Sequence, residues 1–171
     1  MTYFADLSEY TYFEPLPGTK NIGWLSAGHD FKRAVLPDFL LERLWQFCKV
    51  SIAQSRGIHN CELCSEDACR VQRNDERLLL GTSEIRVFGT AGEIYAAPTL
   101  IYHYIVDHHY APPEEFLVAL QEGASPPDKS YFDRLVELGL TWNATLQWTE
   151  RRSERPVRGR LGSPQKGKKR P

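Results

Sequence analysis

The chain has no apolar run long enough to cross a bilayer, for which about 20 consecutive apolar residues are needed. Its first nine residues carry acidic side chains and lack the basic start and apolar centre of a secretory signal. Met1 is the only methionine, so a methionine-rich binding groove is also excluded. These absences predict a cytoplasmic protein without a membrane partner, and we expect its four cysteines to be reduced.

Several enzyme signatures are missing as well. The chain has no glycine-rich phosphate loop and no Gly-x-Ser-x-Gly elbow. It has no His-x-Glu and no proline before its Cys-x-x-Cys, so the zinc-deaminase signature is absent. What remains is a chain of 171 residues without internal repeats, 42% hydrophobic and 12% aromatic, which is enough for one domain with a core.

Positive charge is scarce in most of the chain and concentrated at one end. Residues 150–171 hold nine Lys and Arg against two Glu, a net charge of +7, whereas the preceding 149 residues carry −8. Because nucleic-acid binding needs local positive charge, only the tail over residues 151–170 is suited to it. The composition of the tail, rich in Pro, Gly, Arg and Lys, predicts disorder.

Apolar spacing predicts an α+β fold: one domain over residues 1–149, followed by the basic tail over residues 150–171. Residues 1–36 are expected to form short extended pieces whose aromatic side chains cover the core. About four helices are expected, at residues 37–55, 98–108, 112–123 and 128–139, with Asp38 capping the first and Gly57 ending it. A small antiparallel meander is expected between the first two, at residues 71–73, 77–80, 83–88 and 93–96.

Two thiols and a later histidine segment suggest one metal site. Cys61 and Cys64 form a Cys-x-x-Cys turn, and His103 and His108 follow about forty residues later. Zn²⁺ prefers four such ligands in a tetrahedron, so we predict a structural zinc ion held by these four residues. On a regular helix the two histidines point about 140° apart, so both reach one metal only if the helix tightens or unwinds near His108.

Other ligand sets stay open at this stage. His59 can replace either histidine, because it lies two residues before the thiols, and Cys69 can complete a three-cysteine cluster. Asp107 lies on the helical face of His103 and can orient its imidazole, whereas His109 is expected to be exposed. Free thiols without a metal, and a catalytic or redox site, are the competing interpretations. The redox one is weakened because a helix precedes the motif.

Four segments of the chain resemble an uncharacterised family of small bacterial proteins. They are Arg56-Gly57-Ile58-His59-Asn60-Cys61-Glu62-Leu63-Cys64, residues 81–87, residues 92–104 and residues 108–116. The resemblance covers residues 3 to 142 and leaves out the basic tail. It implies a bacterial cytoplasmic domain of unknown function, and it favours pairing the Cys-x-x-Cys with the His103 segment.

We therefore expect a non-enzymatic binding or adaptor module that binds a protein partner through its acidic surface. An accessory or immunity-type protein is one form of this hypothesis. The alternative is a metal-dependent hydrolase or nuclease, with His59 or His109 and Glu84 beside an open zinc position. Glu84 and Arg86 alternate with core residues on one predicted strand, so a cross-strand ion pair is the more ordinary interpretation of these charges. Nucleic-acid association through residues 151–170 is a third hypothesis.

Overall fold

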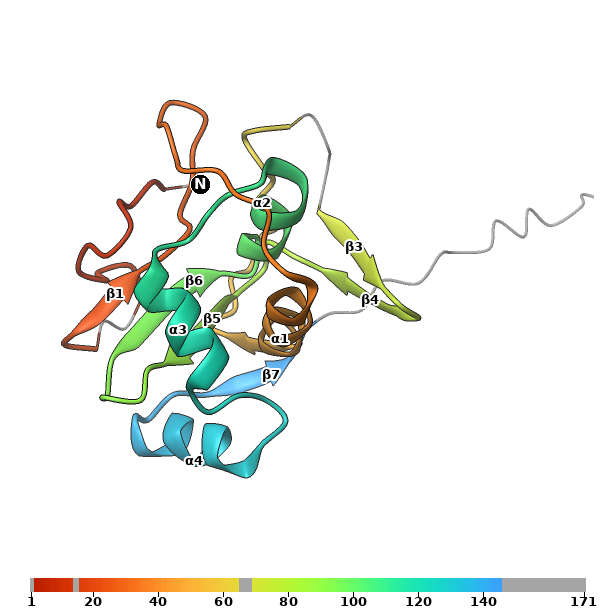
Figure 1. Ribbon diagram of the computed structural model, residues 1–171. Helices are drawn as coiled ribbons and strands as arrows, with labels where there is room; N and C mark the ends of the chain where they lie inside the picture. The colour runs from red at the N-terminus through yellow and green to blue at the C-terminus, as the bar shows by residue number, and fades with distance from the viewer. Residues whose placement is uncertain (1, 14–15, 65–68, 146–171) are drawn as a thin grey trace, which may run out of the picture.

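The chain folds as an α+β protein with four helices and seven strands among the residues that the structure describes (Figure 1). The computed structural model describes residues 2–13, 16–64 and 69–145, which hold all the features reported below. The helices are α1 (Asp38–Cys48), α2 (Ile101–His108), α3 (Glu114–Glu122) and α4 (Lys129–Glu137). The strands are β1 (Thr19–Asn21), β2 (Val50–Ile52), β3 (Arg70–Arg73), β4 (Glu76–Leu79), β5 (Glu84–Phe88), β6 (Ile94–Pro98) and β7 (Trp142–Ala144).

Five of the strands form one sheet in the order β1-β6-β5-β2-β7. All its pairings are antiparallel except that of β1 with β6, in which Lys20 lies opposite Tyr95. Helices α1 and α3 pack on β5, and α4 lies beside β7, where Phe132 and Trp142 are in contact (Figure 1). The expected α+β class with an antiparallel-rich sheet is confirmed, although the sheet is larger than the predicted meander.

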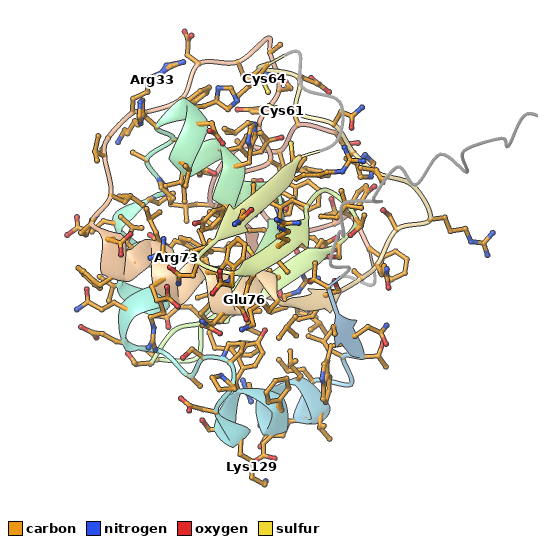
Figure 2. All side chains as sticks on the ribbon, turned by 90° about the vertical axis from the view of Figure 1, so that its right-hand side faces the viewer. Arg33, Cys61, Cys64, Arg73, Glu76 and Lys129 are labelled. Carbon is orange, nitrogen blue, oxygen red and sulfur yellow. The ribbon has the colours of Figure 1, made fainter. Side chains whose placement is uncertain are left out.

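The predicted meander divides into two sheets. β3 and β4 pair only with each other, in a hairpin whose turn residue Asn74 has a φ of 52°, whereas β5 and β6 belong to the main sheet. Ion pairs attach the hairpin to α1: Arg73 contacts Asp38 at 2.8 Å and Glu42 at 2.6 Å. Figure 2 shows Arg73 and Glu76 against this helix, and Glu76 accepts a hydrogen bond from Trp45 Nε1 at 2.7 Å.

The first helix is shorter than predicted. It ends at Cys48 rather than near Ser55, and Gly57 has no part in its end. Ile52 fits the apolar stripe of the predicted helix, yet it lies with Val50 in β2 between β5 and β7. Val and Ile favour strands. The two strands that flank β2 come from distant parts of the chain, so the helical periodicity of the local sequence gave the wrong assignment.

The predicted helix starts are wrong at two positions, Asp38 and Pro98. Asp38 makes no capping hydrogen bond, because Pro37 occupies the N-cap and the Asp38 carboxylate pairs with Arg73. Pro98 does not open α2 but is the last residue of β6, where it lies opposite Glu84. The ends of α2 and α3, at His108 and before Gly123, agree with the prediction.

β5 is buried on both faces, which its alternation of charged and apolar residues did not predict. The N-terminal segment covers the charged face: Tyr10 and Trp24 are 1% and 2% exposed, and the Tyr10 hydroxyl lies 2.8 Å from Glu84 Oε2. Arg86 Nη1 donates to the same oxygen at 2.7 Å. The pair therefore forms along one strand rather than across two, and it is buried rather than solvent-exposed.

Two further expectations concern the chain as a whole. None of the helices in the described ranges is long and apolar enough to span a bilayer. The boundary at residue 149 and the basic tail over residues 150–171 lie outside the described residues, so the predicted disorder there stays a prediction.

Candidate metal centre

The Cys-x-x-Cys turn follows a loop that leaves β2 and runs along the start of β5. Ser55 N–H donates to the Thr82 carbonyl at 2.7 Å, and His59 N–H donates to the Gly81 carbonyl at 2.8 Å. Gly81 has a φ of +83°, and a Cβ there would collide with the His59 carbonyl. The glycine therefore permits the close approach that holds the loop, and the loop holds the thiols of Cys61 and Cys64 beside α2.

The two histidines come from α2, whose last turn is wider than an α-helical turn. The backbone N–H groups of His109 and Tyr110 both donate to the Tyr104 carbonyl, five and six residues back. A turn closed at a spacing of five holds more residues than the usual 3.6, so residues five apart approach the same face. His103 and His108 converge for this reason, which meets the geometric condition derived from their spacing.

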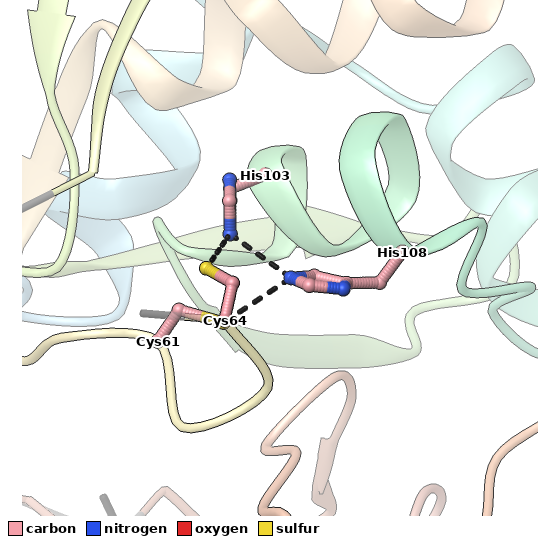
Figure 3. A group of neighbouring side chains, drawn as sticks. All are labelled: Cys61, Cys64, His103 and His108. Carbon is pink, nitrogen blue, oxygen red and sulfur yellow. Dashed lines mark hydrogen bonds between the residues drawn. The ribbon is translucent and has the colours of Figure 1, made fainter. Parts of the chain in front are cut away.

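The four side chains form a compact group in which the nitrogen and sulfur atoms point toward one another (Figure 3). Cys61 Sγ lies 3.3 Å from His108 Nε2, and Cys64 Sγ lies 3.4 Å from His103 Nε2. The two Nε2 atoms are 3.2 Å apart, and all four ligand atoms lie within 4.8 Å of one another. Cys61, Cys64, His103 and His108 are thus positioned to hold one metal ion.

These separations agree with those around a tetrahedral zinc ion. Bond lengths of about 2.3 Å to sulfur and about 2.05 Å to nitrogen put two nitrogens about 3.3 Å apart and a sulfur about 3.6 Å from a nitrogen. The three separations given above, 3.2, 3.3 and 3.4 Å, differ from these values by about 0.3 Å or less. The other pairs of ligand atoms lie within 4.8 Å, so the group would have to contract around a bound metal.

The family comparison covers all four residues of this group. The family model "Domain of unknown function (DUF7919)" matches residues 2–121, about 70% of the chain, and this stretch contains all four ligand residues. The chain belongs to this family. The match confirms an uncharacterised family, and it ends earlier than the expected residue 142. No curated protein and no solved structure matches the chain.

Burial in this DUF7919 domain disfavours ionised side chains at the site unless a cation is present. Burial raises the pKa of the Cys61 thiol to about 11. Burial, and then the neighbouring His103, lower the pKa of the His108 imidazole, which keeps the ring in the neutral form that binds metals. A bound divalent cation would instead favour the ionised form of the two cysteines, because its positive charge stabilises thiolates.

Polar groups around the thiols also fit a metal. Leu63 N–H donates to Cys61 Sγ at 3.3 Å, an interaction that favours the thiolate. The hydroxyl of Tyr104 is buried and has no partner among the described residues, and its pKa is raised by burial and by the nearby Cys61. A buried hydroxyl that lacks an acceptor is compatible with a thiolate formed nearby on metal binding. No sequence pattern singled out Tyr104.

Asp107 orients His103, as its helical spacing suggested. Its Oδ2 lies 2.7 Å from His103 Nδ1, four residues away on α2. With Nδ1–H donated to this carboxylate, Nε2 is left with its lone pair toward the thiols, which is the tautomer that a metal ligand requires. The imidazole side chain is 8% exposed and the carboxylate 52% exposed, so the contact joins a buried ligand to the surface.

We expect Asp107→Asn to weaken Zn²⁺ binding by about 10- to 100-fold, the usual effect of losing such a contact behind a ligand. The carboxamide can still accept a hydrogen bond, but its lack of charge reduces the basicity of His103. Competition titration with a chromophoric chelator measures the effect. Asp133→Asn, on the exposed surface of α4, serves as the matched control and should bind as tightly as the unchanged chain.

The reserve ligands lie outside the four-residue group. His59 is half-buried and lines a hollow next to Glu84 and Trp24, and it is not part of the cluster. Cys69 is buried at the start of the β3–β4 hairpin, where its carbonyl accepts Leu80 N–H at 2.9 Å. His109 is exposed, as expected, with a left-handed φ of 57°. The structure thus brings together the preferred set without either reserve residue.

Proposed function

We propose that the chain holds one structural Zn²⁺ through Cys61, Cys64, His103 and His108, and that it is a non-enzymatic binding or adaptor module. The observation that carries the proposal is the convergence of the four ligand atoms, all within 4.8 Å of one another. Two thiolates and two imidazoles form a donor set that zinc prefers, whereas Mg²⁺ and Ca²⁺ prefer oxygen.

The closed ligand set favours a structural over a catalytic role. A catalytic zinc keeps one position for water or substrate, whereas four protein ligands complete the coordination sphere. Five hollows along the described residues are lined by none of the four ligand residues. The centre thus joins the loop after β2 to α2, and its ligands line none of these five hollows.

The metal-dependent hydrolase is less well supported. It requires His59 or His109 together with Glu84 beside an open metal position. Glu84 is instead engaged by Arg86 and Tyr10, and burial raises the pKa of its carboxyl, although Arg86 and Tyr10 act in the opposite direction. None of these three residues joins the group of ligand atoms. We therefore favour the binding module.

The partner that we propose is a protein of the bacterial cytoplasm. It binds the acidic surface of the domain. The support for this is the net charge of −8 over residues 1–149, which disfavours nucleic acids and anionic membranes. Nucleic-acid binding through residues 151–170 is a separate proposal, and those residues lie outside the described part of the chain.

Cobalt substitution tests whether the centre is closed. Co²⁺ in place of zinc should give the strong visible absorption of tetrahedral coordination, together with thiolate charge-transfer bands. Because four protein ligands leave no exchangeable position, we expect added cyanide or azide to leave this spectrum unchanged below the concentration that strips the metal. A saturable spectral change at lower concentration would reveal an open position and favour the hydrolase.

A further inference from the structure

The metal centre is not enclosed evenly by the protein. Each of the two segments that form it contributes one buried and one half-buried ligand. Cys61 and His103 are 5% and 6% exposed, whereas Cys64 and His108 are half-buried. The turn that carries both thiols lies at the periphery of the molecule (Figure 2). One thiol of the pair is therefore open to small solutes, and the other is shielded from them.

Cys64 combines the two properties of an oxidisable cysteine. Ligation to zinc keeps a cysteine as the thiolate, which is the form that reacts with peroxides, and partial exposure admits the reagent. In thioredoxin-like motifs a helix that follows the cysteines stabilises the thiolate. At this turn a bound zinc ion would supply the stabilising charge instead.

Cys61 is placed to react with an oxidised Cys64. The two sulfur atoms lie within 4.8 Å of each other, and the backbone bends over residues 62–64. A disulfide bond is about 2.05 Å long, so the two sulfurs must approach each other for the bond to form. Neither cysteine lies in a helix or a strand, so the turn can adjust once the metal leaves.

The other two cysteines are poor competitors for the oxidant. Cys48 is fully buried on α1, where its thiol donates to the Thr99 carbonyl at 3.8 Å, and Cys69 is buried before β3. Neither belongs to the four-ligand group, so the metal holds neither of them as a thiolate. Exposure and ligation thus select the same pair, Cys61 and Cys64.

We propose that the metal centre responds to peroxide: oxidation joins Cys61 to Cys64 in a disulfide and releases the zinc ion. The inference rests on the structural zinc site proposed above and adds a means of regulating that site. Release of zinc removes the bonds through which the metal ties the loop after β2 to α2.

The oxidation proceeds in two steps. The Cys64 thiolate attacks one oxygen of hydrogen peroxide; an S–O bond forms, the O–O bond breaks, and the released hydroxide takes up a proton to become water. The Cys61 thiolate then attacks the Cys64 sulfur; the S–S bond forms, the S–O bond breaks, and the second hydroxide leaves as water. The two thiolates lose two electrons and the peroxide gains two, whereas zinc stays divalent and dissociates after losing half of its ligands.

Treatment of the zinc-loaded full chain with hydrogen peroxide tests the proposal. We expect one zinc ion to be released for every two thiols lost, measured with a chromophoric chelator and a thiol reagent. Dithiothreitol followed by Zn²⁺ should restore both the thiols and the bound metal. Oxidation of methionine does not obscure the result, because Met1 is the only methionine of the chain.

Peptide mapping identifies the thiols that react. Cleavage after Glu62 and Glu66 places Cys61, Cys64 and Cys69 in three different peptides. We expect a disulfide between the first two cysteines, and dimedone present during a brief treatment should label Cys64 rather than Cys61. A disulfide to Cys69, or labelling mainly of Cys61, would overturn the assignment.

Two variants separate disulfide formation from general damage by the oxidant. Cys64→His supplies an imidazole ligand in place of the thiolate and cannot form the disulfide, so it should keep its zinc under the treatment that empties the unchanged chain. Cys69→Ser is the matched control and should release zinc as fast as the unchanged chain. Equally fast release from a zinc-loaded Cys64→His variant would contradict the proposal.

The outcomes distinguish this inference from the proposed function. A chain that binds zinc and keeps it during peroxide treatment overturns the redox response and leaves the structural zinc site intact. A chain that never binds zinc overturns both.

Discussion

Purified protein will carry one zinc ion per chain, and Cys61→Ser or His103→Ala will lose it. Each substitution removes one of four ligands, so the loss of affinity should exceed the roughly 10- to 100-fold expected for an outer contact. Serine preserves the size of Cys61 but cannot supply a thiolate, so the change tests the ligand rather than the packing. Metal content measured by mass spectrometry, after dialysis against metal-free buffer, gives the stoichiometry.

Matched variants test the choice among the thiols and the histidines. Cys69→Ser should keep full zinc content, because Cys69 lies outside the four-ligand group. His109→Asn should keep it too, and asparagine tolerates the left-handed backbone at this exposed position. Loss of zinc in Cys69→Ser would shift the site toward a three-cysteine cluster. A wild-type chain without zinc, or a Cys61→Ser variant with full zinc, would overturn the assignment.

Removal of the metal will lower the melting temperature by about 10 °C. A ligand present at about 1,000 times its Kd stabilises the folded state by about 4 kcal/mol, and 1 kcal/mol shifts the midpoint of a chain of this size by about 2–4 °C. The domain should stay folded at lower temperature, because its core of large buried side chains, such as Trp45, Phe47 and Tyr131, does not depend on the metal. Calorimetry with and without chelator measures the shift.

The control for this experiment is a chain that cannot bind metal. The double variant Cys61→Ser with Cys64→Ser should melt at the temperature of the chelated wild type and should be insensitive to chelator. Adding zinc back should restore the wild-type melt and leave the variant unchanged. An identical wild-type melt with and without chelator would mean that the thiols and imidazoles come together without a metal.

Helices α3 and α4 were the most predictable elements of this fold. Pro113 and Gly123 bound α3 as the sequence indicated, and α4 begins directly after Asp128. Such ends depend on the chain within a few residues, because proline lacks a backbone donor and glycine commonly follows a helix. The β3–β4 hairpin was predictable for the same reason, since its turn is local.

The strands that pair with distant segments were not predictable in this way. β2 looked helical because Ile52 extends the apolar stripe of α1, and only pairing with β5 and β7 makes the segment a strand. β1 pairs with β6 across more than seventy residues. Short strands depend on tertiary partners for their stability, so periodicity over three residues carries little information.

For the metal centre, the sequence by itself determined the chemistry: two thiols in one turn, two imidazoles on one later segment, and a carboxylate four residues after the first histidine. The tertiary structure decided which of the five histidines meet the thiols. His59 is close in sequence but lines a hollow with Glu84 outside the group, whereas the widened end of α2 brings His108 beside His103. The type of each ligand is a property of its side chain and can be read from the sequence. The meeting of the four ligands depends on backbone hydrogen bonds at a helix end and on contacts between distant segments.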